Sequence, residues 1–279
     1  MWSLLSMSLT VPQVALSLDR PKVDIAAQVA PSDATPSASS GTYVVATGKN
    51  DGSDDASATG SNAVALGAAA KAGADFGVAL GAMATVTARD GIAIGHASIA
   101  DSNAIAMGNG SNAKGESSIA IGGNFFGSVG DQVGAQATSY GAVALGATSK
   151  ASGNSSTALG WGANATAESA TAVGASARAS GVSSSAIGPS ATASGPAAAA
   201  FGYGSSAAGD TSIAIGSAAE AKGYAAVAVG ALSVASGNGG VAVGDSALAQ
   251  GQQSVAIGAS NKGVLTQANG IGSVSVGAG

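Results

Sequence analysis

SVAIG at 254–258 is the last of fourteen copies of one five-residue motif. In most copies a small residue is followed by an aliphatic residue, an alanine, a second aliphatic residue and a glycine. The earlier copies are AVALG (63–67), GVALG (77–81), GIAIG (91–95), AIAMG (104–108), SIAIG (118–122), AVALG (142–146), STALG (156–160), ATAVG (170–174), SSAIG (184–188), AAAFG (198–202), SIAIG (212–216), AVAVG (226–230) and GVAVG (240–244).

The spacing of the closing glycines is nearly constant. Eleven of the thirteen steps between them have one length, fourteen positions, as from Gly67 to Gly81. The step from Gly95 to Gly108 is one position shorter, and the step from Gly122 to Gly146 is ten positions longer. A fixed short period over about two hundred residues is the signature of a solenoid.

Each repeat predicts two short strands. In Val255-Ala256-Ile257 the two aliphatic residues share one face of a strand and the alanine takes the other. A weaker alternation follows, as in Ala247-Leu248-Ala249, and a second glycine often stands seven residues after the first. A glycine every seven residues would cost a helix about 1 kcal/mol each. We therefore predict an all-β fold, a flattened parallel β-roll of about 14–15 coils in which each coil is one 14-residue repeat.

One chain of this kind is expected to be only marginally stable. Ordering one such coil costs roughly 20 kcal/mol, and the burial and hydrogen bonds of that coil return about the same amount. A partner chain is therefore expected. We predict that the aliphatic residues fill each chain's own core and that the central alanines face neighbouring chains, although the pattern leaves the opposite assignment open. The predicted interface residues are Ala65, Ala79, Ala93, Ala144, Ala158, Ala172, Ala214, Ala228, Ala242 and Ala256.

The repeated (S/A)-(V/I)-A-(I/L/V)-G motif at 14-residue spacing resembles the head of trimeric autotransporter adhesins, the YadA-type family of Gram-negative surface proteins. The resemblance covers about Ala56 to Gly258. It implies a homotrimer of left-handed parallel β-rolls that is displayed beyond the outer membrane. It also implies adhesion to host matrix, to host cells or to sibling bacteria. The heptad-repeat stalk and the four-stranded membrane anchor of the family are not found, so the chain reads as a fragment.

The sequence divides into two regions. Residues 1–42 are expected to hold an apolar stretch (1–19), either a signal remnant or a disordered tail, and a linker rich in proline, serine and alanine. Residues 43–279 are expected to form the β-roll head, with regular repeats over 56–258 and a degenerate terminal coil over 259–279.

The one long irregular step contains an inserted loop, which we place at 123–134. Insertions in solenoids map to loops on one face, which is often the binding face. Phe125, Phe126 and Asp131 are therefore candidates for a ligand contact or a trimer contact. The alternative is a structural role, in which the two phenylalanines fill a gap, cover the edge of a neighbouring coil or pack across the trimer.

The composition argues against several classes of function. A formal net charge of −5 disfavours nucleic acid and anionic membranes as partners. With no cysteine and a single histidine, thiolate metal sites are excluded, and His96 is the one possible histidine anchor for a metal cluster or a Ser-His-Asp triad. His96 is expected to be an ordinary turn residue. We expect no enzyme activity, no cofactor and no metal site.

Two functions remain. The first is a cell-surface adhesin head at the bacterial outer membrane that binds extracellular matrix proteins such as collagen, fibronectin or laminin, or host cells, through the outer face of the trimer. The second is a structural spacer of a longer surface protein without a ligand of its own. The exposed aromatic candidates for the outer surface are Trp161, Tyr203 and Tyr224.

Overall fold

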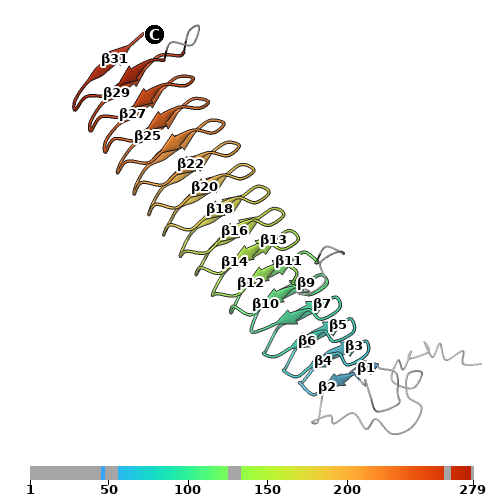
Figure 1. The fold of residues 1–279 in the computed structure, drawn as a ribbon. Helices are drawn as coiled ribbons and strands as arrows, with labels where there is room; N and C mark the ends of the chain where they lie inside the picture. The colour runs from blue at the N-terminus through green and yellow to red at the C-terminus, as the bar shows by residue number, and fades with distance from the viewer. Residues whose placement is uncertain (1–44, 48–55, 125–132, 261–264, 278–279) are drawn as a thin grey trace, which may run out of the picture. The chain divides into compact units, whose positions relative to one another are not determined.

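The computed structural model describes residues 45–47, 56–124, 133–260 and 265–277, all within one unit that spans Ala34–Gly279. These residues form a stack of coils in which every coil contributes one strand to each of two parallel sheets (Figure 1). The prediction of a parallel β-solenoid with two sheets is confirmed, and no helix occurs among the described residues.

Sheet A has 16 strands and sheet B has 15. Sheet A consists of β1 (Val45–Thr47), β3 (Val64–Leu66), β5 (Val78–Leu80), β7 (Ile92–Ile94), β9 (Ile105–Met107), β11 (Ile119–Ile121), β13 (Val143–Leu145), β15 (Thr157–Leu159), β17 (Thr171–Val173), β19 (Ser185–Ile187), β21 (Ala199–Phe201), β23 (Ile213–Ile215), β25 (Val227–Val229), β27 (Val241–Val243), β29 (Val255–Ile257) and β31 (Val274–Val276). Sheet B consists of β2 (Ser57–Ala58), β4 (Lys71–Ala72), β6 (Thr85–Val86), β8 (Ile99–Ala100), β10 (Asn112–Ala113), β12 (Gln136–Ala137), β14 (Lys150–Ala151), β16 (Asn164–Ala165), β18 (Arg178–Ala179), β20 (Thr192–Ala193), β22 (Ser206–Ala207), β24 (Glu220–Ala221), β26 (Val234–Ala235), β28 (Leu248–Ala249) and β30 (Gln267–Ala268).

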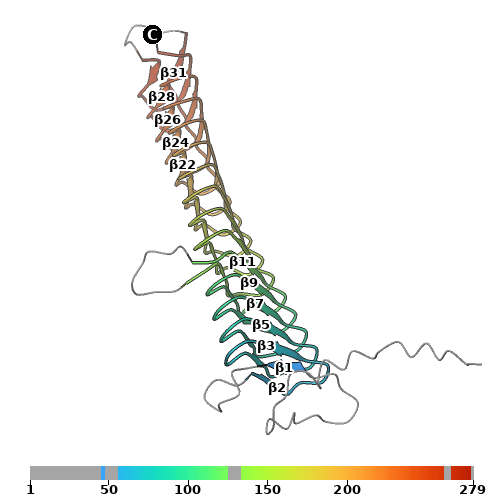
Figure 2. The ribbon, with the colours of Figure 1, turned by 90° about the vertical axis from the view of Figure 1, so that its right-hand side faces the viewer.

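Equivalent residues of successive coils lie side by side. In sheet A, Ala144 of β13 pairs with Ala158 of β15, and Leu145 pairs with Leu159. In sheet B, Ala151 of β14 pairs with Ala165 of β16. Because the register is kept from coil to coil, each position of the repeat forms a continuous ladder along the stack (Figures 1 and 2).

Two kinds of turn connect the sheets. Turn 1 leads from a strand of sheet A to the next strand of sheet B, as in 67–70, and turn 2 leads back to sheet A, as in 73–77. We call the two sides of the stack that these turns form the turn-1 edge and the turn-2 edge. Turns of only four or five residues hold the sheets close together, so only small side chains fit between them.

The core is accordingly made of alanine and serine. The central alanine of each sheet A strand from β3 to β29 is fully buried within its own chain, and so are most alanines of sheet B. This contradicts the predicted face assignment. The ten alanines named above as interface residues lie inside the single chain, where no neighbouring chain can reach them, and the aliphatic residues of the motif point outward.

Backbone geometry explains the glycines and reveals a second requirement. The closing glycines of the motif have φ between +122° and +149°, a region that only glycine occupies readily. In addition, one residue of nearly every turn has φ near +55°, and most of these are not glycine. Ala218 is typical: its φ is 52°, and its backbone N–H donates to the carbonyl of Tyr203 in the preceding coil at 2.8 Å. Hydrogen bonds between coils thus hold alanine and serine in the left-handed conformation.

The irregular coils all have their extra residues in the same place. Five residues more than usual separate β1 from β2 and β29 from β30, and ten more separate β11 from β12. Each of these connections is a turn 1. The short coil instead loses its residue from turn 2, between β8 and β9. Insertions are therefore confined to the turn-1 edge.

Candidate interaction surfaces

The outer face of sheet A is a double ladder of mostly aliphatic side chains. Each strand presents its first and third residues outward while its central alanine points inward. The third residues from β3 to β31 are all large and apolar, and several are well exposed, as with Leu159 at 43 % and Ile257 at 42 %. They are Leu66, Leu80, Ile94, Met107, Ile121, Leu145, Leu159, Val173, Ile187, Phe201, Ile215, Val229, Val243, Ile257 and Val276.

The first residues of the same strands are less uniform. They are valine or isoleucine in most coils, but Thr157, Thr171, Ser185 and Ala199 occupy four successive coils. The smallest of these, Ala199, shares its strand with the largest third residue, Phe201. The third-position ladder therefore stays apolar where the first-position ladder becomes polar or small. Contiguous exposed apolar side chains of this kind are typical of interaction sites.

The outer face of sheet B carries most of the described positive charge. Of the six lysine and arginine residues in the described part of the chain, five lie on or directly after strands of sheet B, and all five are exposed: Lys71, Lys114, Lys150, Arg178 and Lys222. Lys222 pairs with Glu220 of β24, and both side chains are about half exposed. An ion pair at this exposure adds little stability.

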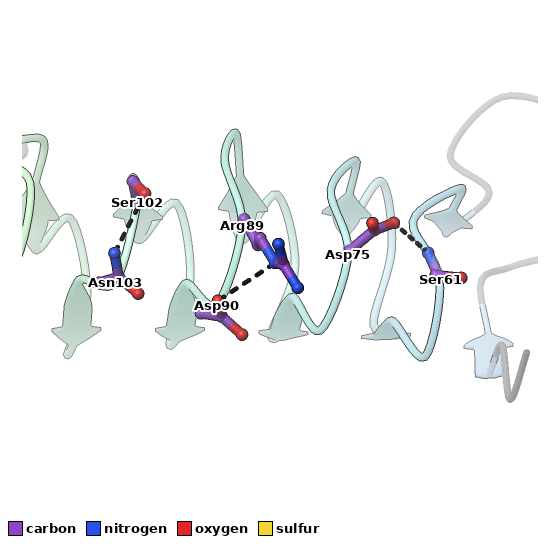
Figure 3. A network of polar contacts seen from close by, with 6 residues as sticks. All are labelled: Ser61, Asp75, Arg89, Asp90, Ser102 and Asn103. Atoms are coloured by element: carbon purple, nitrogen blue, oxygen red, sulfur yellow. Dashed lines mark hydrogen bonds and ion pairs between the residues drawn. The ribbon is translucent and has the colours of Figure 1, made fainter.

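The turn-2 edge is acidic. The tips of its turns carry Asp75, Asp90, Glu116, Glu168 and Asp210, and the one described base at these tips is Arg89. Figure 3 shows one end of this edge: the backbone N–H of Ser61 donates to Asp75 Oδ1 at 2.7 Å, and Arg89 Nε lies 3.5 Å from Asp90 Oδ2. The Arg89 guanidinium also lies 5.3 Å from the centroid of the Phe76 ring. These exposed contacts leave the carboxylates in solvent.

The turn-1 edge has little charge and carries two exposed aromatic rings. Trp161 is 58 % exposed and Tyr203 is 66 % exposed. His96 also lies on this edge, where its Nδ1 is 3.2 Å from Asn109 Oδ1 of the next coil. The interpretation of His96 as an ordinary turn residue fits this contact. Asp245 is the one acidic residue in a described turn 1.

The residues that the sequence singled out are now placed. Phe125, Phe126 and Asp131 lie outside the described residues, so their predicted role in a ligand or trimer contact stays a prediction. The charged residues Lys150, Glu168, Arg178, Asp210, Glu220, Lys222 and Asp245 lie on the outer surface as expected. The aliphatic ladder of sheet A was missed as a surface, because alternation shows that alanine and aliphatic residues face opposite ways but does not show which side is inside.

No cluster of three or more potential metal-ligating side chains occurs among the described residues. No helix in the described ranges is long and apolar enough to cross a bilayer. The outer face of sheet A is mostly apolar, that of sheet B carries most of the described positive charge, and the turn-2 edge is acidic.

Comparison with known families agrees with this architecture. The family described as YadA head domain repeat (2 copies) matches ten segments, most of which overlap a neighbour: 58–84, 75–98, 102–124, 137–163, 151–177, 165–191, 179–205, 193–219, 207–233 and 235–261. Together they cover more than half of the chain. A search of curated proteins found no matching relative.

Proposed function

We propose that this chain, which belongs to the YadA head domain family, is the non-enzymatic head of a trimeric adhesin displayed on a bacterial outer membrane. In this proposal three left-handed rolls associate through the outer face of sheet A. The other sides of the trimer then bind extracellular matrix proteins, host cells or sibling bacteria.

The observation that carries the proposal is the exposed third-position ladder of sheet A. Large apolar side chains repeat without interruption from Leu66 to Val276. Burying apolar surface contributes about 25 cal/mol per Å², and the alanine core of a single roll buries few large side chains. Association through this ladder supplies the missing burial. Membership of the YadA head family supports an assembly of three chains.

The revised interface replaces the alanines proposed from the sequence. Within the outer face of sheet A, the third-position ladder is proposed to lie in the dry centre of the assembly because no polar residue interrupts it from β3 to β31. Thr157, Thr171 and Ser185 are proposed to lie nearer its margin, where their hydroxyls reach water.

Adhesion is proposed to be distributed along the stack. Similar groups repeat from coil to coil on the outer face of sheet B and along the acidic turn-2 edge, which suits a fibrous or multivalent target through avidity. Candidate targets are collagen, fibronectin and laminin. The inserted loop with Phe125, Phe126 and Asp131 stays a candidate contact in this proposal.

The assembly is tested by the solution mass of the chain. Light scattering over a dilution series is expected to give three times the 25.6 kDa chain mass. Ile187→Glu with Ile215→Glu places charges in the exposed sheet A ladder and is expected to give monomers. Thr192→Glu with Ser206→Glu is the matched control on the outer face of sheet B and should keep the mass. A wild-type monomer, or an Ile187→Glu/Ile215→Glu trimer, would contradict the proposed interface.

A separate measurement tests adhesion. The purified chain is assayed for solid-phase binding to collagen, fibronectin, laminin and cultured cells, with the Ile187→Glu/Ile215→Glu monomer alongside. Avidity predicts binding by the trimer and much weaker binding by the monomer. A correctly assembled trimer that binds none of these targets would favour the spacer function, in which other regions of a longer protein make the contacts.

A further inference from the structure

Five large exposed side chains on the two edges follow a second period that the repeat itself does not require, while Met83, Leu232 and Ile271 are exposed on the edges outside this series. Tyr140, Trp161, Val182, Tyr203 and Tyr224 follow one another at every twenty-first position of the chain. All five are more than half exposed, from 52 % for Val182 to 66 % for Tyr203. They include every tyrosine and tryptophan that the structure describes.

This second period equals one and a half coils, so successive members alternate between edges. Tyr140, Val182 and Tyr224 lie on the turn-2 edge, and Trp161 and Tyr203 lie on the turn-1 edge. Members on the same edge are three coils apart. At about 4.8 Å per coil, this separates the two turn-1 rings by about 14 Å along the stack.

Along the turn-1 edge, the residues between Trp161 and Tyr203 are small and uncharged. Ala175 and Pro189 occupy the equivalent place in the two intervening coils, and both are exposed. The residues that follow in each turn are Gly162, Ser176, Ser190 and Gly204. Both aromatic side chains therefore lie along a row of small residues, and each is more than half exposed.

Inter-coil hydrogen bonds fix this row. The Trp161 carbonyl accepts from the N–H of Ser176 at 2.8 Å, and the Ala175 carbonyl accepts from that of Ser190 at 2.9 Å. The Pro189 carbonyl accepts from the N–H of Gly204 at 2.9 Å. The backbone under the rings is thus set before any ligand arrives, which lowers the entropic cost of binding.

The turn-2 edge lacks these properties. Glu168 lies between Tyr140 and Val182, and Asp210 lies between Val182 and Tyr224. The turn-1 edge is also where all three insertions of the solenoid lie, and such insertions often mark the binding side. These differences favour the turn-1 edge as the ligand site.

We propose that the turn-1 edge between Trp161 and Tyr203 binds a neutral, extended polysaccharide. The apolar faces of its sugar rings would stack on the two aromatic side chains, and its hydroxyls would bond to the serine and backbone groups between them. The rise from one coil to the next is close to the length of one pyranose unit in an extended polysaccharide. Successive sugar rings therefore lie over successive coils from Trp161 to Tyr203. A protein partner is disfavoured, since isolated rings separated by small residues do not form the continuous apolar core of a protein interface.

This site gives the proposed adhesin a specific class of ligand. It rests on the proposed function in one respect: the turn-1 edge has to stay accessible in the trimer. The test is affinity electrophoresis of the full chain in native gels that contain hydroxyethyl cellulose, galactomannan or laminarin. The wild type is expected to be retarded by at least one of them. Trp161→Ala with Tyr203→Ala is expected to abolish the retardation, since each stacked ring contributes roughly tenfold in affinity by analogy with stacked bases. Trp161→Phe with Tyr203→Phe should retain most of it.

Two variants control for exposure and for spacing. Tyr140→Ala with Tyr224→Ala removes the same number of exposed rings from the turn-2 edge and should be retarded like the wild type. Deletion of residues 175–188 removes one whole coil, keeps the phase of the repeat and brings the two rings to two coils apart. It should weaken the retardation in the gel that retards the wild type.

The outcomes separate this inference from the assembly. A trimer that none of the three polysaccharides retards would overturn the site and leave the proposed trimer intact. A monomer whose retardation depends on Trp161 and Tyr203 would support the site and contradict the trimer. If the Tyr140→Ala/Tyr224→Ala control lost as much retardation as the Trp161→Ala/Tyr203→Ala variant, the site would be overturned. The site would also be overturned if wild-type trimers associated with one another and the Trp161→Ala/Tyr203→Ala variant did not, because the two rings would then form contacts between trimers.

Discussion

The side chain of Val86 fills the space beside Gly77: its Cγ1 atom lies 2.9 Å from the point where a β-carbon on Gly77 would stand. Gly91, the equivalent residue one coil later, has the same relationship with Val86 at 2.8 Å. Val86 is the one large apolar residue among the fully buried side chains of the described core. The chain accommodates it by replacing the usual alanine or serine with glycine on both sides.

Adding a methyl group at Gly77 should therefore overpack the core. Gly77→Ala is expected to lower the free energy of unfolding by about 1–3 kcal/mol. Val86→Ala should lower it by about 1–2 kcal/mol through lost burial. The double variant should be more stable than the sum of the two losses predicts, because the new methyl group occupies the space that Val86 vacates. Urea unfolding at one fixed chain concentration measures all three, and strict additivity would show that the two sites do not share space.

Gly202 and Gly204 lie in one turn but are expected to differ sharply in how well they tolerate substitution by alanine. Gly204 has φ +62° and open space around its Cα, and Ala218 takes the same conformation one coil later. Gly204→Ala should cost about 1–2 kcal/mol, the penalty of a left-handed residue with a β-carbon. Gly202 has φ +128°, and a β-carbon there would stand 2.5 Å from the carbonyl oxygen of Gly216.

Gly202→Ala should consequently cost more than about 3 kcal/mol, because both the backbone conformation and the contact with the next coil have to change. Thermal unfolding followed by circular dichroism compares the two variants directly. Equal midpoints for Gly202→Ala and Gly204→Ala would contradict the steric role assigned to the closing glycines.

Buried serines of the core should fall into two groups. Ser149 Oγ donates to the Gly146 carbonyl at 2.8 Å, whereas Ser184 Oγ has no hydrogen-bond partner within the described part of the chain. Both residues are fully buried, and alanine occupies each position in neighbouring coils. Ser149→Ala is expected to lose about 1 kcal/mol, the net value of one hydrogen bond.

Ser184→Ala should be neutral or should gain up to about 1 kcal/mol, since it removes a buried hydroxyl that bonds to nothing. Chemical unfolding of the two variants beside the wild type gives the comparison. A loss for Ser184→Ala as large as that for Ser149→Ala would mean that the Ser184 hydroxyl has a partner in solution, such as a buried water.

The sequence was sufficient to predict the architecture, but it did not show which face of each strand is buried in the core. The 14-residue period predicted the coils, the parallel register and the two sheets, because one register repeats throughout. It did not predict which face of Val143-Ala144-Leu145 is inside, because that depends on the distance between the sheets. Four- and five-residue turns set this distance, and only small side chains fit. The insertion is a different case: the step from Gly122 to Gly146 showed that ten residues are inserted, the sequence placed them at 123–134, and β12, which begins after that segment, pairs with β10.

Ala144 and Leu145 are neighbours on β13 that should respond to the same substitution in different ways. Ala144 is fully buried between the sheets, while Leu145 lies on the outer face of sheet A. Ala144→Asp places an unpaired carboxylate in a dry core, which should cost several kcal/mol and unfold the surrounding coils. Leu145→Asp puts its charge outside and should keep the β-sheet signal while weakening any assembly through sheet A. Circular dichroism and light scattering on the same samples separate the two effects. A folded Ala144→Asp variant that merely dissociates would restore the original assignment of the alanines to the interface.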